Sequence, residues 1–144
     1  MATNLVYRND NKQNRVETLA ATYAPGKPVV SLGGLPAVTV TGSGDYTKSE
    51  VIPGVGTLSG IAAGGVGLEG KEVSLAFDGT WEFDKAEFGG TLPAANIAQG
   101  NKVYITSAGV LTTTAGSNTL FGYFDYPKEY DKTRGFLPIR IGAL

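Results

Sequence analysis

Short runs in which apolar and polar residues alternate, separated by glycine-containing turns, are the feature of this sequence that most restricts its fold. A period of two residues is typical of strands that bury one face, because successive side chains of a strand point to opposite sides. The clearest run is "EVSLAFDG" (Glu72–Gly79), in which Val, Leu and Phe alternate with other residues. It ends in Asp78 and Gly79, a dipeptide that favours tight hairpin turns, and "TWEFDK" (Thr80–Lys85) follows as the next strand.

Comparable runs recur about every ten residues, which predicts roughly seven or eight short strands and an all-β fold, a small single-domain barrel or sandwich. The further runs are "PVVSL" (Pro28–Leu32), "AVTVT" (Ala37–Thr41), "KVYITS" (Lys102–Ser107), "VLTTT" (Val110–Thr114), "TLFGYFDY" (Thr119–Tyr126) and "GFLPIRIG" (Gly135–Gly142). Turn sequences at Ala108-Gly109 and Ala115–Asn118 predict two consecutive hairpin connections. Pro138 lies inside the last run and predicts an edge position for that strand, or a strand that begins there.

Helical periodicity is scarce, and the two short helix candidates are Gln13–Thr22 and Pro93–Gln99. The length of 144 residues predicts one domain. Within it we expect a polar N-terminal arm over residues 1–16 and a β-domain over residues 17–144. The glycine-rich segment of about residues 41–67 is predicted to be a long insertion or loop, a kind of segment that is usually functional or mobile.

The balance of 12 basic and 13 acidic residues gives a net charge of −1, which argues against electrostatic capture of nucleic acid or an anionic membrane. The first residues lack the apolar run of a secretory signal, and the least polar window, Gly60–Leu68, is too short to span a bilayer. We therefore expect a soluble, uncleaved protein with neither nucleic-acid nor membrane partners.

Residues that usually carry chemistry are few. Histidine and cysteine are absent, which removes the usual zinc sites and the Ser-His and Cys-His nucleophiles. Pro53–Gly60 lacks the Lys-Ser/Thr pair of a phosphate loop, and Arg8–Asn14 lacks the glycine and terminal glutamate of a calcium loop. Glu82 and Asp84 share a strand face, so an acid–base hydrolase is one hypothesis, but such pairs are usually the solvated face of a strand. We expect no catalytic residues, no metal and no cofactor.

The segment "YPKEYDKTRG" (Tyr126–Gly135) mixes tyrosines with charges of both signs. Tyrosine and arginine are enriched at protein interfaces, so a protein-contact loop is the favoured interpretation. A carbohydrate-binding or tail-adhesin module that uses Tyr126 and Tyr130 as exposed aromatics is the alternative.

Three blocks of sequence resemble a known family. "IAQGNKVYITSAGVLTTTAGSNTLFGYF" (Ile97–Phe124) resembles the signature of the phage capsid cement (decoration) proteins, a strand of the form A-x-G-D-K-V-Y-W, a Thr-rich strand and then G-N-x-x-I-G-x-A. "PGKPVVSLGGLPAV" (Pro25–Val38) and "GKEVSLAFDGTWEFDKA" (Gly70–Ala86) are similar to two further family blocks in the same order. The segment around Thr41–Gly67, the long charged loop and the very polar N-terminal residues depart from the family pattern.

The resemblance implies a small β-barrel-like domain that forms a homotrimer and binds the major capsid protein. It also implies a structural, non-enzymatic protein that cements the outer surface of a tailed-phage icosahedral head and is made in the host cytoplasm. Seven candidate capsid-contact residues come from the two polar segments outside the β pattern: Leu5, Tyr7, Arg8, Tyr126, Lys128, Tyr130 and Arg134.

Overall fold

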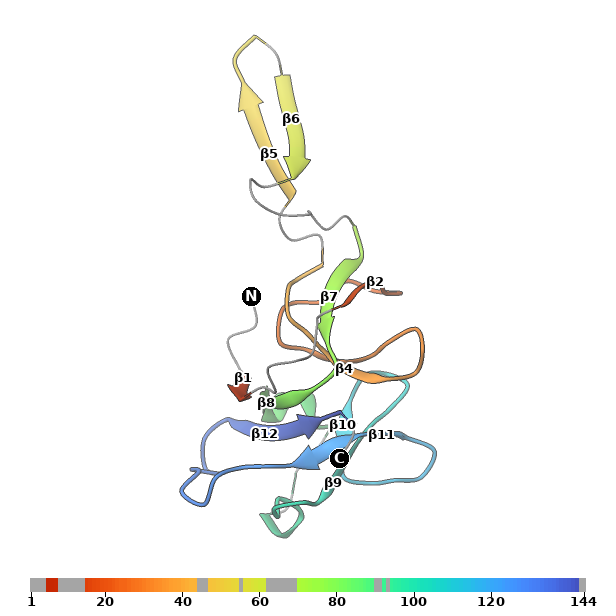
Figure 1. Cartoon of the computed structure of the whole chain (residues 1–144), viewed down its shortest axis with the longest axis vertical. Helices are drawn as coiled ribbons and strands as arrows, with labels where there is room; N and C mark the ends of the chain where they lie inside the picture. The colour runs from red at the N-terminus through yellow and green to blue at the C-terminus, as the bar shows by residue number, and fades with distance from the viewer. Residues whose placement is uncertain are drawn as a thin grey trace.

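The computed structural model describes residues 5–7, 15–43, 47–54, 56–61, 70–89, 92 and 94–142, and these confirm the all-β prediction. The larger of two packed antiparallel sheets curls into a half-barrel (Figure 1). Its strands, in order across the sheet, are β1 (Leu5–Tyr7), β8 (Gly79–Asp84), β12 (Phe136–Ile141), β11 (Thr119–Phe124), β9 (Lys102–Ile105) and β10 (Leu111–Thr112).

The second sheet has four strands and packs on the first. In order across it they are β2 (Arg15–Thr18), β7 (Glu72–Ala76), β4 (Pro36–Thr39) and β3 (Pro28–Val30). A further two-stranded sheet, formed by β5 (Thr47–Ile52) and β6 (Gly56–Ile61), stands away from the two larger ones in Figure 1. These two strands were not predicted from the glycine-rich segment. Their turn begins with Pro53 and Gly54, and Gly54 has a φ of 81°, as the third residue of a type II turn requires.

The main hydrophobic core lies between the two larger sheets. Val38 and Ala76 of the four-stranded sheet pack in one cluster with Trp81, Phe83 and other buried residues of the six-stranded sheet. A smaller cluster lies on the opposite face of the four-stranded sheet and contains Leu19, Val29, Ala37, Val73 and Leu75. Both faces of the four-stranded sheet are therefore packed against apolar residues. This explains why its strands carry apolar residues at adjacent positions in the sequence.

The dipeptide Asp78-Gly79 makes a corner between the sheets and not the tight hairpin turn that its sequence favours. β7 belongs to the four-stranded sheet and β8 to the six-stranded sheet. Gly79 has a φ of 94°, which lets the chain change direction. The Trp81 indole N–H donates to the Asp78 carbonyl at 2.7 Å and so closes the corner inside the core.

The edge position predicted for the last strand is wrong, because β12 lies between β8 and β11. Both backbone polar groups of a strand residue point toward the same neighbouring strand. The Pro138 carbonyl accepts a hydrogen bond from the Asp125 N–H at 3.3 Å, so the missing N–H of Pro138 also faces the end of β11. The proline therefore removes no hydrogen bond from the long β8–β12 ladder.

The helix predicted over Gln13–Thr22 is also wrong, because Arg15–Thr18 forms strand β2. Its four residues pair with β7, from Arg15 opposite Leu75 to Thr18 opposite Glu72. Pairing with a buried strand outweighs a weak helical pattern in a segment that contains β-branched residues. The second candidate shortens to a single 3-10 turn, η2 (Ala94–Asn96).

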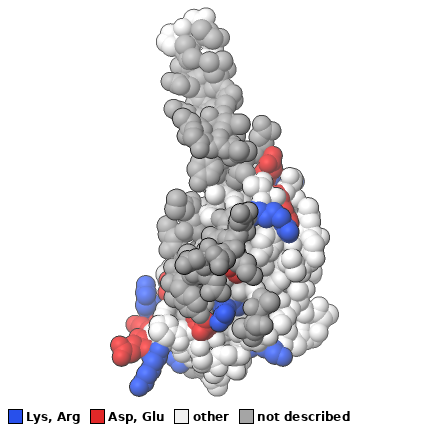
Figure 2. Space-filling view, in the orientation of Figure 1, with Lys and Arg blue, Asp and Glu red and all other residues white. Residues whose placement is uncertain are grey.

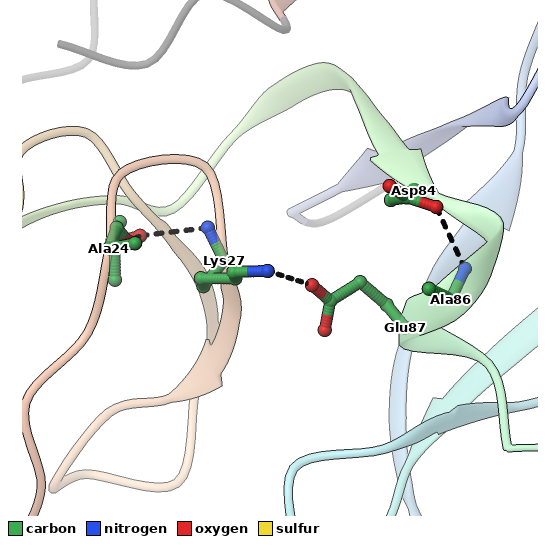
Figure 3. Close-up of polar contacts among 6 residues, drawn as sticks. Ala24, Lys27, Asp84, Ala86 and Glu87 are labelled. Carbon is green, nitrogen blue, oxygen red and sulfur yellow. Dashed lines mark hydrogen bonds and ion pairs between the residues drawn. The ribbon is translucent and has the colours of Figure 1, made fainter.

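A second 3-10 turn, η1 (Lys85–Glu87), carries a polar link between the sheets (Figure 3). The Asp84 carboxylate caps this turn by accepting a hydrogen bond from the Ala86 N–H at 2.9 Å. The Glu87 carboxylate then pairs with the ammonium of Lys27, which immediately precedes β3. The start of β3 and the turn after β8 are thus in contact through a partly exposed ion pair.

Candidate functional site

The loop between β11 and β12, residues 125–135, starts from a half-buried polar anchor, Asp125. Both carboxylate oxygens of Asp125 accept hydrogen bonds, one from the Thr80 hydroxyl at 3.1 Å and one from the Gln99 side-chain amide at 2.9 Å. The Gln99 carbonyl oxygen in turn accepts from the Tyr126 N–H at 2.9 Å. Because Thr80 is fully buried on β8, this network ties the beginning of the loop to the middle of the six-stranded sheet.

Tyr126 forms the inner part of the loop. Its half-buried ring packs against the main core, and its hydroxyl donates to the Ile97 carbonyl at 3.2 Å. The Lys132 ammonium lies 5.0 Å from the centre of the Tyr126 ring and 3.4 Å from its hydroxyl oxygen. The Tyr130 ring lies beside it, with 6.1 Å between ring centres. The two rings therefore pack within the loop and do not form an open stacking platform for a sugar.

Tyr130 and Arg134 meet at Glu82, which lies on β8. The Tyr130 hydroxyl donates to a carboxylate oxygen of Glu82 at 2.6 Å, and the Arg134 guanidinium lies 3.9 Å from the same oxygen. Burial raises the pKa of the Tyr130 phenol well above its usual range, and the hydrogen bond to Glu82 raises the pKa further. The Tyr130 hydroxyl therefore keeps its proton at neutral pH and donates a hydrogen bond to Glu82.

The two acidic residues considered as a catalytic pair serve separate contacts. Glu82 binds the β11–β12 loop, whereas Asp84 caps η1. Among the described residues, no group of three or more histidine, cysteine, aspartate or glutamate side chains is placed to hold a metal ion. In the same part of the chain, no helix has the length and apolar character needed to cross a bilayer.

A tight turn forms the exposed tip of the loop. The Tyr130 N–H donates to the Pro127 carbonyl at 2.9 Å, so Lys128 and Glu129 occupy the two central positions of the turn, and both are exposed. Beyond the tip, the hydroxyl and N–H of Thr133 donate to the Asp131 carboxylate and lower its pKa.

The end of the loop is fixed to η1, which directly follows β8. The Lys85 N–H donates to the Gly135 carbonyl at 2.9 Å, and the Lys85 ammonium donates to the Lys132 carbonyl at 2.8 Å. Figure 2 shows basic and acidic side chains gathered at the end of the molecule where Figure 1 places this loop. The loop thus presents many charges from a firmly held backbone.

The structure brings four of the seven candidate contact residues together in this loop: Tyr126, Lys128, Tyr130 and Arg134. Leu5 and Tyr7 lie on β1, which pairs with β8 on the side away from β12, with Leu5 opposite Trp81 and Tyr7 opposite Thr80. Arg8 lies outside the described residues. Sequence reasoning missed the role of the residues that anchor the loop, because Thr80, Glu82 and Gln99 are 26 to 52 residues away from their partners in it. Only the register of β8 against β12 could have revealed Glu82 as such a partner.

An apolar groove of about 290 Å³ lies on another part of the surface, where the β3–β4 turn approaches β11. Its described lining residues are uncharged: Leu35, Pro36, Phe77, Leu120, Phe121, Gly122, Tyr123 and Gly142. Leu35 and Leu120 are 52% and 39% exposed, and the neighbouring Leu32 is 74% exposed. Exposed apolar surface of this kind is typical of contact sites between proteins.

Comparison with known proteins decides the family. The sequence model of the phage cement proteins matches residues 33–139, which include both acidic residues of β8, the β11–β12 loop and every described lining residue of the apolar groove except Gly142. The chain belongs to the phage cement protein family. No curated protein and no solved structure matches it.

The cement family confirms the resemblance found in the sequence. Phage cement proteins are structural components located on the capsid of the virion, they bind capsid proteins, and they are not enzymes. The local geometry is consistent with this role. In this cement protein the polar residues of β8 hold a surface loop in place, and the loop carries charges to the surface.

Proposed function

We propose that this cement protein acts as a homotrimer on the outer face of an icosahedral phage head. There it binds the major capsid protein through its N-terminal residues and the β11–β12 loop. The observation that carries this proposal is the combination, in one loop, of exposed charges and a backbone that hydrogen bonds hold to β8. Preorganisation of this kind lowers the entropic cost of binding a partner.

The candidate contacts fall on two neighbouring parts of the six-stranded sheet. Lys128 and Arg134 are exposed in the loop, and Tyr126 and Tyr130 support them from within. Leu5, Tyr7 and Arg8 belong to a polar N-terminal segment that reaches the same sheet at β8. A polar segment that orders on a capsid extends the contact area, at an entropic cost that the added contacts must exceed.

Association between copies is supported by the apolar groove. In a closed ring each contact joins two different surfaces, one from each copy. The exposed Leu32 lies close to the groove of Leu35 and Leu120, and this uncharged apolar patch would supply one of those surfaces. A trimer engages several capsid subunits at once, and linked contacts raise the overall affinity by about 10²- to 10⁴-fold without any new contact.

Binding to particles tests the capsid contact. Purified protein is mixed with phage particles that lack it, and bound protein is measured by co-sedimentation and located by electron microscopy. We expect saturable binding at repeated positions on the outer surface. A variant without residues 1–14, which loses the three-residue edge strand β1 and keeps strand β2, is expected to retain a β-type circular dichroism spectrum and to lose decoration. Unchanged binding by this variant would remove the N-terminal residues from the proposed contact.

Analytical ultracentrifugation tests the trimer. The wild-type protein is expected to sediment at three times the chain mass, and Leu35→Asp with Leu120→Asp is expected to shift it toward the monomer. The matched control is Leu111→Met, a volume-conserving change at a fully buried position, which leaves the groove intact. A wild-type protein that stays monomeric at all concentrations, and also on the particle, would contradict the trimer.

A further inference from the structure

The charged residues of the β11–β12 loop fall into two groups. Asp125, Asp131, Lys132 and Arg134 each bind another residue of the loop or its support: Thr80, Thr133, Tyr126 and Glu82, respectively. Lys128 and Glu129 form no hydrogen bond or ion pair within the part of the chain that the structure describes. These two opposite charges therefore stay fully available to a partner.

The backbone that presents these two charges is held from both sides. Pro127, whose ring fixes φ, opens the turn, and the Tyr130 N–H closes it by donating to the Pro127 carbonyl at 2.9 Å. The Tyr130 hydroxyl, bound to Glu82 at 2.6 Å, fastens the closing residue to β8. A turn fixed in this way holds the backbone of Lys128 and Glu129 in one conformation, so that both side chains start from fixed positions.

We propose that the turn of Lys128 and Glu129 contacts an oppositely ordered pair of charged side chains, one acidic and one basic, on the capsid protein, and that Tyr130 is the positioning residue that holds the turn for this contact. This inference rests on the proposed binding of the loop to the capsid. Adjacent charges of opposite sign cancel at a distance, so they do not favour a uniformly anionic nucleic acid or membrane. At close range they favour a surface with the complementary pattern, which supplies specificity and a salt-dependent association rate.

Charge reversal tests the turn. Lys128→Glu and Glu129→Lys are each expected to weaken binding to cement-free particles at least tenfold, because each places like charges together in the contact. Lys71→Glu is the matched control. Lys71 is exposed, and its ammonium donates to the Ala20 carbonyl, near the four-stranded sheet, so its reversal should leave binding within twofold. Wild-type affinity should fall with added salt, and Lys128→Ala with Glu129→Ala should flatten that dependence. Binding within twofold of wild type for both reversals would overturn the inference.

A pair of variants tests Tyr130. Tyr130→Phe keeps the ring and removes the hydroxyl, so we expect five- to tenfold weaker binding through slower association, with the salt dependence kept because both charges remain. Glu82→Gln retains a side-chain oxygen that can accept the hydrogen bond from the Tyr130 hydroxyl, so this variant should bind particles as the wild type does. Glu82→Ala removes that oxygen, so it should weaken binding to particles as much as Tyr130→Phe does. Equal association rates for Tyr130→Phe and wild type would refute the positioning role.

The failure of this inference can be told apart from failure of the proposed function. If the wild-type protein does not bind particles at all, the proposed function falls and the inference falls with it. If the wild-type protein binds, the variant without residues 1–14 does not, and both charge reversals bind normally, only the inference is wrong. Loss of binding in the charge reversals, with normal binding by the Lys71 control, supports both.

Discussion

Replacing Gly122 by alanine should destabilise the protein strongly, although the change adds one methyl group. Strand β11 contains a bulge between Leu120 and Gly122, which lets both Phe121 and Phe124 face the core. A Cβ atom at Gly122 would lie 2.2 Å from the Arg140 carbonyl oxygen and 2.9 Å from a methyl carbon of Ile139. The closest atom belongs to the backbone of β12, so no side-chain rotation can relieve the clash.

The size of the effect follows from what must move. Overpacking a well-packed site costs about 1–3 kcal/mol. Separating β11 from β12 also weakens one or two ladder hydrogen bonds, each worth about 1 kcal/mol net. We therefore expect a loss of about 3 kcal/mol. For 144 residues the unfolding entropy is about 0.3 kcal/mol per kelvin, so the melting temperature should fall by ~10 °C.

Thermal unfolding followed by circular dichroism, at one fixed protein concentration because association shifts the transition, measures this effect. Gly135→Ala is the matched control, since its Cβ would meet open space and its backbone lies outside the left-handed region. It should melt within about 3 °C of the wild type, because an unstrained Gly→Ala change alters stability by about 0.4–1 kcal/mol. If Gly122→Ala melts as the control does, the close approach of β11 and β12 is not the reason for this glycine.

Two further predictions concern polar contacts. The folded protein holds the Tyr130 proton more tightly than the unfolded chain, so this stabilisation is complete below pH ~10, the ordinary tyrosine pKa, and is lost as pH rises through the raised pKa. Urea unfolding at pH 8 and pH 11 should therefore show a larger loss for the wild type than for Tyr130→Phe, and equal losses would contradict the assignment. Lys27→Met should cost less than about 1 kcal/mol, because the Lys27 and Glu87 side chains are 43% and 19% exposed and solvent screens their ion pair. A larger loss in urea unfolding would mean that this pair holds the two sheets together.

Strand positions with a strong period of two could be predicted from the sequence, and their partners could not. The run at Glu72–Gly79 does form a strand, and Lys102–Ser107 and Val110–Thr114 do contain the paired strands β9 and β10. The second predicted hairpin connection is wrong, because β11 pairs with β9 and not with β10. Turn residues in the sequence predict where the chain changes direction. Which strands then pair depends on which apolar faces the whole chain buries together.

The same limit applies to the candidate site. The mixture of charge and tyrosine predicted a contact loop at Tyr126–Gly135 from composition alone. The composition could not show that Lys128 is exposed whereas Tyr130 supports the loop, because the Tyr130 hydroxyl binds a residue 48 positions earlier in the sequence. That difference depends on the register of β8 with β12, which places Glu82 opposite Pro138 and beneath the loop.

The register also explains why two acidic residues alternate on β8 in a protein that is not an enzyme. Glu82 and Asp84 project from the face of β8 opposite to Trp81 and Phe83, which lie in the core. Each carboxylate holds an irregular segment against the sheet, the β11–β12 loop in one case and η1 in the other. A cement protein must keep its surface segments in fixed positions across many copies, because repeated contacts add together only when every copy presents the same geometry. The acidic face of β8 is therefore best understood as the support for the β11–β12 loop and η1.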